Sequence, residues 1–134
     1  MKIVLKGILA REDAILAAAI GIDGIIVSNH SGRVIDTGRG TIEILPEIVE
    51  AVGGRVPLLV DSGFRRGTDI IKAFAWVPKL SVSGGALWGL GAFGQPGVER
   101  VLEILRNETR AAMQQVGAPS IKQLIPAMVQ KASA

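Results

Sequence analysis

Residues 28–33 bring a hydroxyl, an amide, an imidazole and a guanidinium group within six positions of the chain. Near pH 7 the imidazole of His30 can accept a proton, which makes it a candidate general base. Arg33 can hold a carboxylate through two parallel hydrogen bonds. A base close to a carboxylate anchor suits a 2-hydroxy acid, whose hydroxyl-bearing carbon is bonded to its carboxylate. A satisfied loop histidine beside a surface arginine would have the same spacing, so both interpretations stay open.

Residues 61–69 combine glycine with positive charge. Gly63 and Gly67 allow a ligand to approach the backbone closely. The amide groups of this segment lead into the start of a predicted helix. Arg65 and Arg66 add positive charge. The alternative is a tight turn with two solvated arginines and with Asp69 near the helix cap. Amides, helix dipole and arginine together favour phosphate binding.

Two further positions follow expected strands. Lys6 is either a solvated lysine or a cation placed to stabilise a developing anion. Gly84 and Gly85 would offer a second backbone cradle. In barrels of parallel strands, phosphate often binds at the loops after the last two strands. If the last two strands of this chain are the last two of a barrel, both glycine-containing loops lie where phosphate is expected.

Short apolar runs alternate with helical patterns along the chain. Strands that are apolar throughout are buried on both faces, as in a parallel sheet. The pattern predicts a parallel α/β fold, either open or barrel-like, in a single domain over residues 1–134. The glycines from Gly89 to Gly97 are expected in a flexible loop. We expect strands at residues 3–5, 24–28, 57–60 and 80–83, and helices at 11–20, 41–52, 67–76, 98–116 and 121–130.

Each candidate segment follows the carboxyl end of a predicted strand, and parallel α/β folds place their chemistry on that rim. Four strand–helix units are half of a complete (β/α)8 barrel, which needs about 250 residues. A four-stranded half would leave two strand edges and an apolar face open to solvent. Another copy, a separate chain or a different closure of the fold would have to cover them.

Composition excludes several other functions. The chain has no Cys and one His, so one copy cannot build a thiolate or multi-histidine metal site. Its aromatic residues, two Trp and three Phe, are too few for a base-stacking platform. The net charge is +3, with basic residues interleaved with acidic ones, which argues against nucleic-acid binding. The sequence shows no membrane span or signal peptide, so a cytoplasmic location is expected.

The two motifs together identify a family resemblance. Residues 28–33 read Ser-Asn-His-x-Gly-Arg, and residues 61–69 read Asp-x-Gly-x-Arg-Arg-Gly-x-Asp. Leu-Lys-Gly at residues 5–7 precedes them, and Leu-Trp-Gly-Leu at residues 87–90 follows. With these segments the chain resembles the C-terminal half of the FMN-dependent 2-hydroxy acid oxidases and dehydrogenases, which include glycolate oxidase, lactate oxidase and mandelate dehydrogenase. The resemblance covers nearly the whole chain.

The resemblance implies the C-terminal half of a TIM (β/α)8 barrel that oxidises a 2-hydroxy acid to a 2-oxo acid, with two electrons passing to FMN. It makes His30 the catalytic base and Arg33 the anchor of the substrate carboxylate. Whether His30 would take the hydroxyl proton or the carbon-bound proton stays open. The residues that resemble the family's cofactor contacts are Lys6 at the flavin, Ser28 and Asp61 at the flavin or ribityl chain, and Gly63, Arg65, Gly84 and Gly85 at the phosphate.

The chain also departs from the family pattern. Ser31 stands where glycine is usual, and the arginine that usually follows the last strand glycine is missing after Gly84 and Gly85. The family's first half supplies substrate-contacting tyrosines, a second arginine and the carboxylate that orients the histidine, whereas this chain has no Tyr. We therefore expect activity only with a complementary half-barrel chain. The alternative is a non-catalytic half-barrel that binds phosphate or flavin and self-associates with a second copy.

Overall fold

The computed structural model describes residues 1–35, 38–77 and 85–130, without the side chains of residues 85 and 86. In this part of the chain three parallel strands form one sheet in the order β1-β2-β3. The strands are β1 (Val4–Ile8), β2 (Gly24–Val27) and β3 (Leu58–Val60). The predicted mixed α/β fold with parallel strands is confirmed. The expected strand at 80–83 lies outside the described residues.

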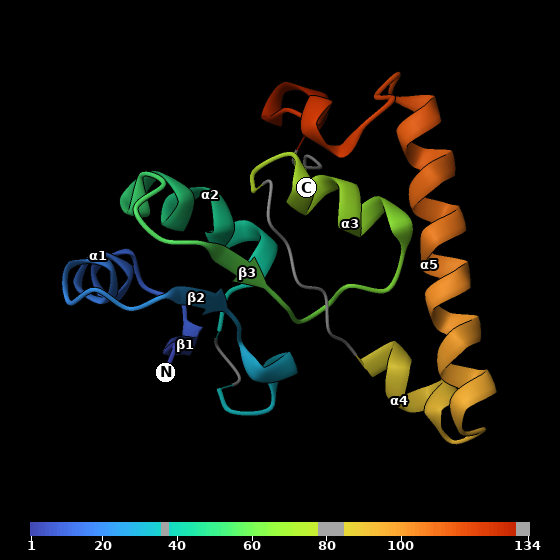
Figure 1. Cartoon of the computed structure of the whole chain (residues 1–134), viewed down its shortest axis with the longest axis horizontal. Helices are drawn as coiled ribbons and strands as arrows, with labels where there is room; N and C mark the ends of the chain where they lie inside the picture. Colours follow the sequence, from blue (N-terminus) through green and yellow to red (C-terminus); the bar gives the residue numbers. More distant parts are fainter. Residues whose placement is uncertain (36–37, 78–84, 131–134) are drawn as a thin grey trace.

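Two helices cover the sheet. Helix α1 (Arg11–Ala19) connects β1 to β2, and α2 (Thr41–Val52) connects β2 to β3. The two helices pack against each other, and each contacts the sheet (Figure 1). Their apolar faces enclose Val27 and Val60, which are fully buried. The apolar patterns of β2 and β3 therefore reflect burial, as the sequence predicts, whereas β1 has no fully buried residue.

The helix predicted at residues 41–52 is confirmed, and its ends follow from two glycines. Gly40 precedes the first turn in an extended conformation. Gly53 ends the helix in the left-handed region, with φ 58°, and donates its amide hydrogen to Val49. Only glycine adopts that conformation without a steric cost, so the helix stops there.

The second half of the chain is helical. Helix α3 (Gly67–Phe74) packs on the long helix α5 (Gln95–Gln115), as does the short helix α4 (Gly85–Gly91). The expectation of a flexible glycine loop is wrong here. Gly89 and Gly91 lie in α4, and Gly97 lies in the first turn of α5, where a Cβ atom would overlap the Leu90 carbonyl oxygen. Gly97 permits α4 and α5 to approach closely, whereas nothing lies within 4 Å of a Cβ position at Gly89. Gly94 lies in the short connection between the two helices.

The helix expected at residues 121–130 is replaced by two short 3-10 turns, Ile121–Gln123 and Pro126–Met128. Pro126 explains the interruption, because the residue before a proline avoids the helical conformation. Ile125 is accordingly extended, with φ −130° and ψ 155°. Leu124 nevertheless packs into a small apolar cluster between α3 and α5.

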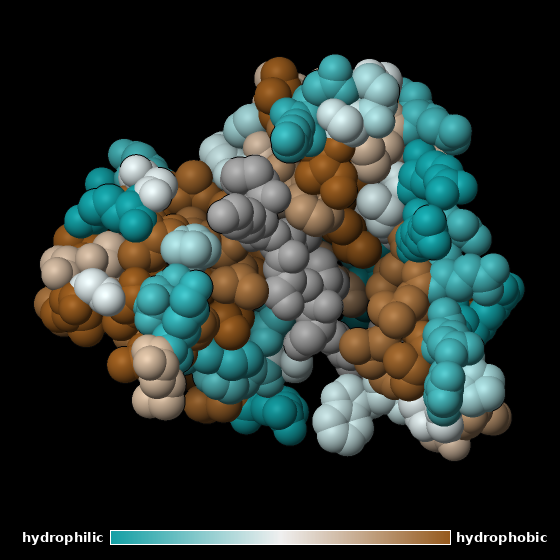
Figure 2. Space-filling model, viewed as in Figure 1, coloured by the Kyte–Doolittle hydropathy of each residue, from teal (hydrophilic) through white to brown (hydrophobic). Residues whose placement is uncertain are grey.

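One end of the molecule exposes apolar residues. Strand β1 is hydrogen-bonded only to β2 among the described strands, and Val4 on it is half-exposed. Leu16 on the neighbouring helix α1 and Ile20 directly after it are 61% and 66% exposed. Figure 2 shows hydrophobic residues gathered at this end. Among the helices described, none has the length and apolar character needed to cross a membrane.

Candidate active site at the strand ends

The carboxyl ends of the three strands bring three predicted cofactor residues into contact. Lys6 is on β1, Ser28 directly follows β2, and Asp61 directly follows β3. The Lys6 Nζ donates to Ser28 Oγ at 2.6 Å and lies 3.1 Å from Asp61 Oδ2. Ser28 is fully buried and Asp61 is 8% exposed. Parallel strands in register explain why residues so far apart in sequence meet at one rim.

Asp61 is held in its charged form. Burial alone would raise its pKa, because it penalises the charged form. Hydrogen bonds from Ser28 and Ser62, together with the Lys6 ammonium, outweigh that cost and hold the pKa of Asp61 below its ordinary value. The cluster therefore carries a carboxylate and an ammonium group side by side.

His30 lies in a strained turn next to this cluster. His30 and Ser31 both have left-handed backbones, with φ 54° and 61°. The His30 amide donates to Ser28 Oγ at 3.2 Å, and the Arg33 Nε donates back to the His30 carbonyl oxygen at 3.3 Å. The imidazole lies against Gly7, where a Cβ atom would stand 2.8 Å from the ring carbon Cε1. Gly7 thus makes room for the ring at the end of β1.

The loop predicted to bind phosphate is stabilised by carboxylates. Asp69 Oδ2 accepts the amide hydrogens of Arg65 and Arg66, each at 3.0 Å. Glu108 Oε2 accepts the amide hydrogen of Gly67 at 2.8 Å. The alternative that places Asp69 at the helix cap is confirmed. These three amides have acceptors within the chain, and phosphate binding at this loop stays a prediction.

A hollow of about 880 Å³ nevertheless opens beside this loop. Gly63 and Arg65 line it, and no described carboxylate lies within salt-bridge distance of the Arg65 guanidinium. Ser31 and Gly32 line its other side, so the His30 loop borders it. The remaining lining residues are Asn29, Gly40, Thr41, Ile42, Ser62, Phe64, Arg66, Asp69 and Lys72.

The predicted residues therefore fall into two adjoining groups. Lys6, Ser28 and Asp61 form one group, and the His30 backbone is bonded to it. Gly63 and Arg65 belong to the hollow, whose lining does not include the side chains of His30 and Arg33. Gly84 lies outside the described residues, and Gly85 is the first residue of α4.

Two residues that sequence reasoning missed connect these groups. Thr41 is buried at the start of α2, and its Oγ1 donates to the carbonyl oxygens of Asp61 and Ser62 at 2.7 and 3.1 Å. Ser62 bonds to Asp61 through its side chain. The only available sequence signals are a hydroxyl residue in the loop after a strand and one at the start of a helix, and both are common.

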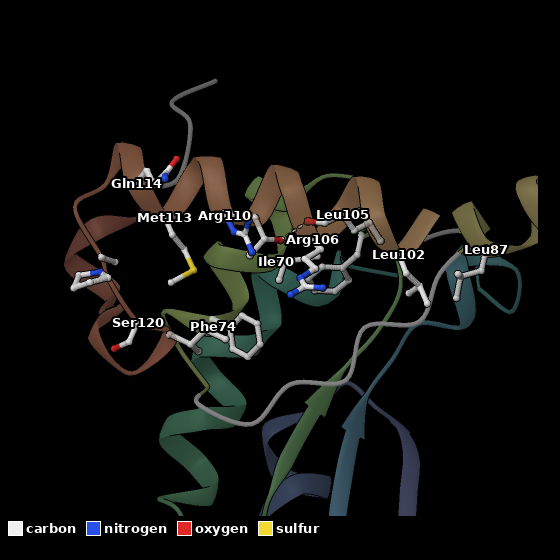
Figure 3. A pocket seen from close by; sticks show the side chains of 15 residues that line it. Ile70, Phe74, Leu87, Leu102, Leu105, Arg106, Arg110, Met113, Gln114 and Ser120 are labelled. Atoms are coloured by element: carbon white, nitrogen blue, oxygen red, sulfur yellow. Dashed lines mark hydrogen bonds between the residues drawn. The ribbon is translucent and has the colours of Figure 1, made fainter. Parts of the chain in front are cut away.

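A second hollow, of about 790 Å³, lies between α3, α5 and the C-terminal turns. Figure 3 shows Phe74 of α3 and Met113 of α5 directed into it. Its charged lining residues in the described chain are Arg106 and Arg110. Because a guanidinium stays protonated in proteins, this hollow offers no group for proton transfer. It also contains none of the residues predicted to do chemistry.

Parallel strand–helix units with polar side chains at the carboxyl ends of the strands define an α/β protein, a class in which ligand sites are typically found on that rim. Comparison with known proteins specifies the family. Residues 1–131 match the FMN-dependent dehydrogenase family model, and the chain belongs to that family.

The relatives include 2-hydroxy acid oxidases. The chain is 47% identical over 122 residues to peroxisomal (S)-2-hydroxyacid oxidase GLO3 of Arabidopsis thaliana, covering 90% of this chain and 34% of the relative. It is 46% identical over 132 residues to human 2-hydroxyacid oxidase 1, covering 98% of this chain and 36% of the relative.

A solved structure matches the fold. A soluble mutant of the membrane-associated (S)-mandelate dehydrogenase from Pseudomonas putida superposes with a TM-score of 0.87 at 41% identity, covering 96% of this chain and 37% of that chain. The chain therefore spans about a third of the length of the relatives that it matches.

Proposed function

We propose that this chain forms the FMN-binding, base-carrying part of an enzyme that oxidises a small 2-hydroxy acid to a 2-oxo acid. The observation that carries the proposal is the meeting of Lys6, Ser28 and Asp61 at one rim, with the His30 loop bonded to Ser28. Membership of the FMN-dependent dehydrogenase family supports it. The names of the relatives support the substrate class.

The residues at the rim fit FMN. A buried carboxylate and a hydroxyl suit a ribityl chain, and the Lys6 ammonium suits a ring that gains negative charge on reduction. Gly63 has open space where a Cβ would stand, and the Arg65 guanidinium beside it suits a phosphate. When bound, FMN would accept the two electrons that the oxidation releases.

His30 and Arg33 would act on the substrate. His30 is exposed, so its imidazole can reach a substrate and take one proton from it, either from the hydroxyl group or from the carbon that bears it. Arg33 is also exposed, and its Nε is the atom bonded to the loop, which leaves the terminal nitrogens to hold a carboxylate. The loop thereby fixes the anchor relative to the base.

The exposed end at β1 and α1 supports a complementary half-barrel chain. Parallel strands are normally covered on both faces and continued at their edges. The apolar residues at this end would pack against a further strand–helix unit, as the greater length of the relatives suggests. We propose that the sheet continues there into a TIM barrel.

The first experiment is an FMN titration of this chain, followed by the quenching of flavin fluorescence. Binding near one FMN per chain is expected, and Asp61→Asn should weaken it about tenfold or more, because it removes a charged hydrogen-bond acceptor. Asp13→Asn, an exposed carboxylate on α1, is the matched control. An unchanged affinity in Asp61→Asn would contradict the cofactor assignment.

The second experiment tests catalysis. The chain is combined with a separately produced segment that corresponds to the first two thirds of human 2-hydroxyacid oxidase 1, loaded with FMN, and mixed with lactate, glycolate or mandelate without oxygen. Bleaching of the flavin is expected, with a loss of at least about 100-fold in rate for His30→Gln and a raised KM for Arg33→Lys. Arg100→Lys, in a surface pair with Glu103, is the control. Flavin binding without bleaching would instead favour the non-catalytic alternative.

A further inference from the structure

The His30 loop contains backbone strain that needs a cause. His30 and Ser31 are consecutive residues with positive φ, and neither is glycine. Such conformations are costly for residues with a side chain, and they persist where the surroundings impose them. Something outside the loop must therefore hold this turn in place.

Two buried hydroxyl groups meet the backbone of the strained turn. Ser28 Oγ accepts the amide hydrogen of His30 at 3.2 Å, and Ser62 Oγ accepts that of Ser31 at 3.1 Å. Ser28 directly follows β2 and lies two residues before His30, so its bond is local. Ser62 belongs to a different strand end, 31 residues further along the chain, and forms the long-range tether.

Ser62 is itself firmly placed. Its Oγ donates to Asp61 Oδ1 at 2.9 Å, and its carbonyl oxygen accepts a hydrogen bond from the buried Thr41 hydroxyl. Its own φ is 73°, so it too is a strained non-glycine residue. The residue is buried, with 9% of its surface exposed. Asp61 takes the hydroxyl proton and Thr41 fixes the backbone carbonyl, so the Ser62 oxygen is in place to accept the Ser31 amide hydrogen.

We propose that Ser62 is a positioning residue whose hydroxyl, placed by Asp61 and Thr41, holds the left-handed turn that presents His30. The inference rests on the proposed function in treating His30 as the base. It extends that function by linking the residue assigned to the cofactor, Asp61, to the loop of the base through one side chain. The Asp61 carboxylate and the His30 turn should therefore respond to each other.

Nuclear magnetic resonance tests this link in the chain without FMN or substrate. His30 is the only histidine, so one set of imidazole signals reports its position. Ser62→Ala and Ser62→Gly both remove the hydroxyl, but only Gly relieves the strain at φ 73°. In both variants we expect the Ser31 amide hydrogen to exchange roughly 2- to 10-fold faster and the His30 ring signals to move in the same direction.

Control variants separate the loss of the Ser62 hydroxyl from changes in backbone strain. Ser120→Ala removes a surface hydroxyl bonded to Gln123 and should leave both signals unchanged. A change in Ser62→Ala but not in Ser62→Gly would assign the effect to backbone strain and overturn the proposal, as would no change in either. If a variant does not fold, the unsubstituted chain decides, because a Ser31 amide that exchanges as fast as in an unfolded chain overturns the tether.

Addition of FMN distinguishes this inference from the proposed function. We expect FMN to move the His30 signals in the unsubstituted chain, and to move them less in Ser62→Gly. Failure of FMN to bind, with the Ser62 effects intact, would remove the cofactor assignment and support the tether. Binding of FMN that moves the His30 signals equally in both chains would overturn the tether.

Discussion

At the scale of single residues, Asp61 determines the charge of the strand-end cluster. It accepts hydrogen bonds on both carboxylate oxygens, from Ser62 and Lys6, and its pKa is lowered despite its burial. A group whose pKa falls on folding stabilises the native state at every pH above its unfolded value. The same carboxylate that suits a ligand therefore also stabilises the unliganded rim.

A pH series of urea unfolding checks this effect. The free energy of unfolding of the chain should exceed that of Asp61→Asn by about 2 kcal/mol at pH 7. The difference should begin to shrink as the pH approaches the ordinary Asp value of 3.8 and vanish below the lowered pKa of the folded state. A difference that grows on acidification would mean that the pKa of Asp61 is raised, contrary to this account. The unsubstituted chain and Asp61→Asn share all other titrating carboxylates, so the difference between their free energies of unfolding reports on Asp61 alone.

The sequence predicted the types of the site residues better than their contacts. His30, Lys6 and Asp61 are recognisable by type and by their place after a strand. The cap contact of Asp69 is local and follows from its place at the start of the helix. The contact of Glu108 with the Gly67 amide was not predictable, because it depends on the packing of two helices whose contacting residues are 41 positions apart. Only the folded chain shows which amides remain for a ligand.

At the scale of elements, periodicity placed helices more reliably than glycine composition placed loops. Helix α2 begins and ends where its apolar pattern and flanking glycines predict. Glycines in α4 and at the start of α5 resemble loop residues in a sequence, but they lie in helices, and Gly97 lies at a close helix contact. Glycine permits both a loose chain and a close approach, and a single sequence does not distinguish them.

Gly67 provides the sharpest test of such a contact. A Cβ atom there would overlap the backbone of α5 at Glu108 and Thr109. Gly67→Ala should therefore force α3 and α5 apart and destabilise the chain by about 2 kcal/mol or more, measured by thermal or urea unfolding. Gly89→Ala is the matched control, because nothing lies within 4 Å of its Cβ position in α4. That helix substitution should be neutral or stabilise the chain by up to about 1 kcal/mol. Equal effects at both positions would contradict the packing account.

At the scale of the whole molecule, the apolar end at β1 and α1 needs a partner to cover it, whereas the strand-end cluster does not. The cluster of Lys6, Ser28 and Asp61 has its polar groups paired by residues of this chain. Leu16 on α1 and Ile20 directly after it remain exposed beside the edge strand β1. An exposed apolar edge favours association with another strand–helix unit. The requirement for a partner thus arises from the end of the sheet, and not from the cluster at Asp61.

Replacing this apolar face should separate folding from assembly. The double variant Leu16→Lys, Ile20→Lys should unfold within about 1 kcal/mol of the parent, because exposed substitutions away from special features change stability little. It should also fail to restore flavin bleaching with the complementary segment. Leu102→Lys, 55% exposed on α5 at the opposite end of the molecule, is the control and should retain complementation (Figure 1).

Sedimentation would show whether the parent self-associates through the same face, in which case the double variant becomes a monomer. Complementation that survives both lysines would mean that the sheet does not continue at β1, because two desolvated ammonium groups would oppose burial of that face.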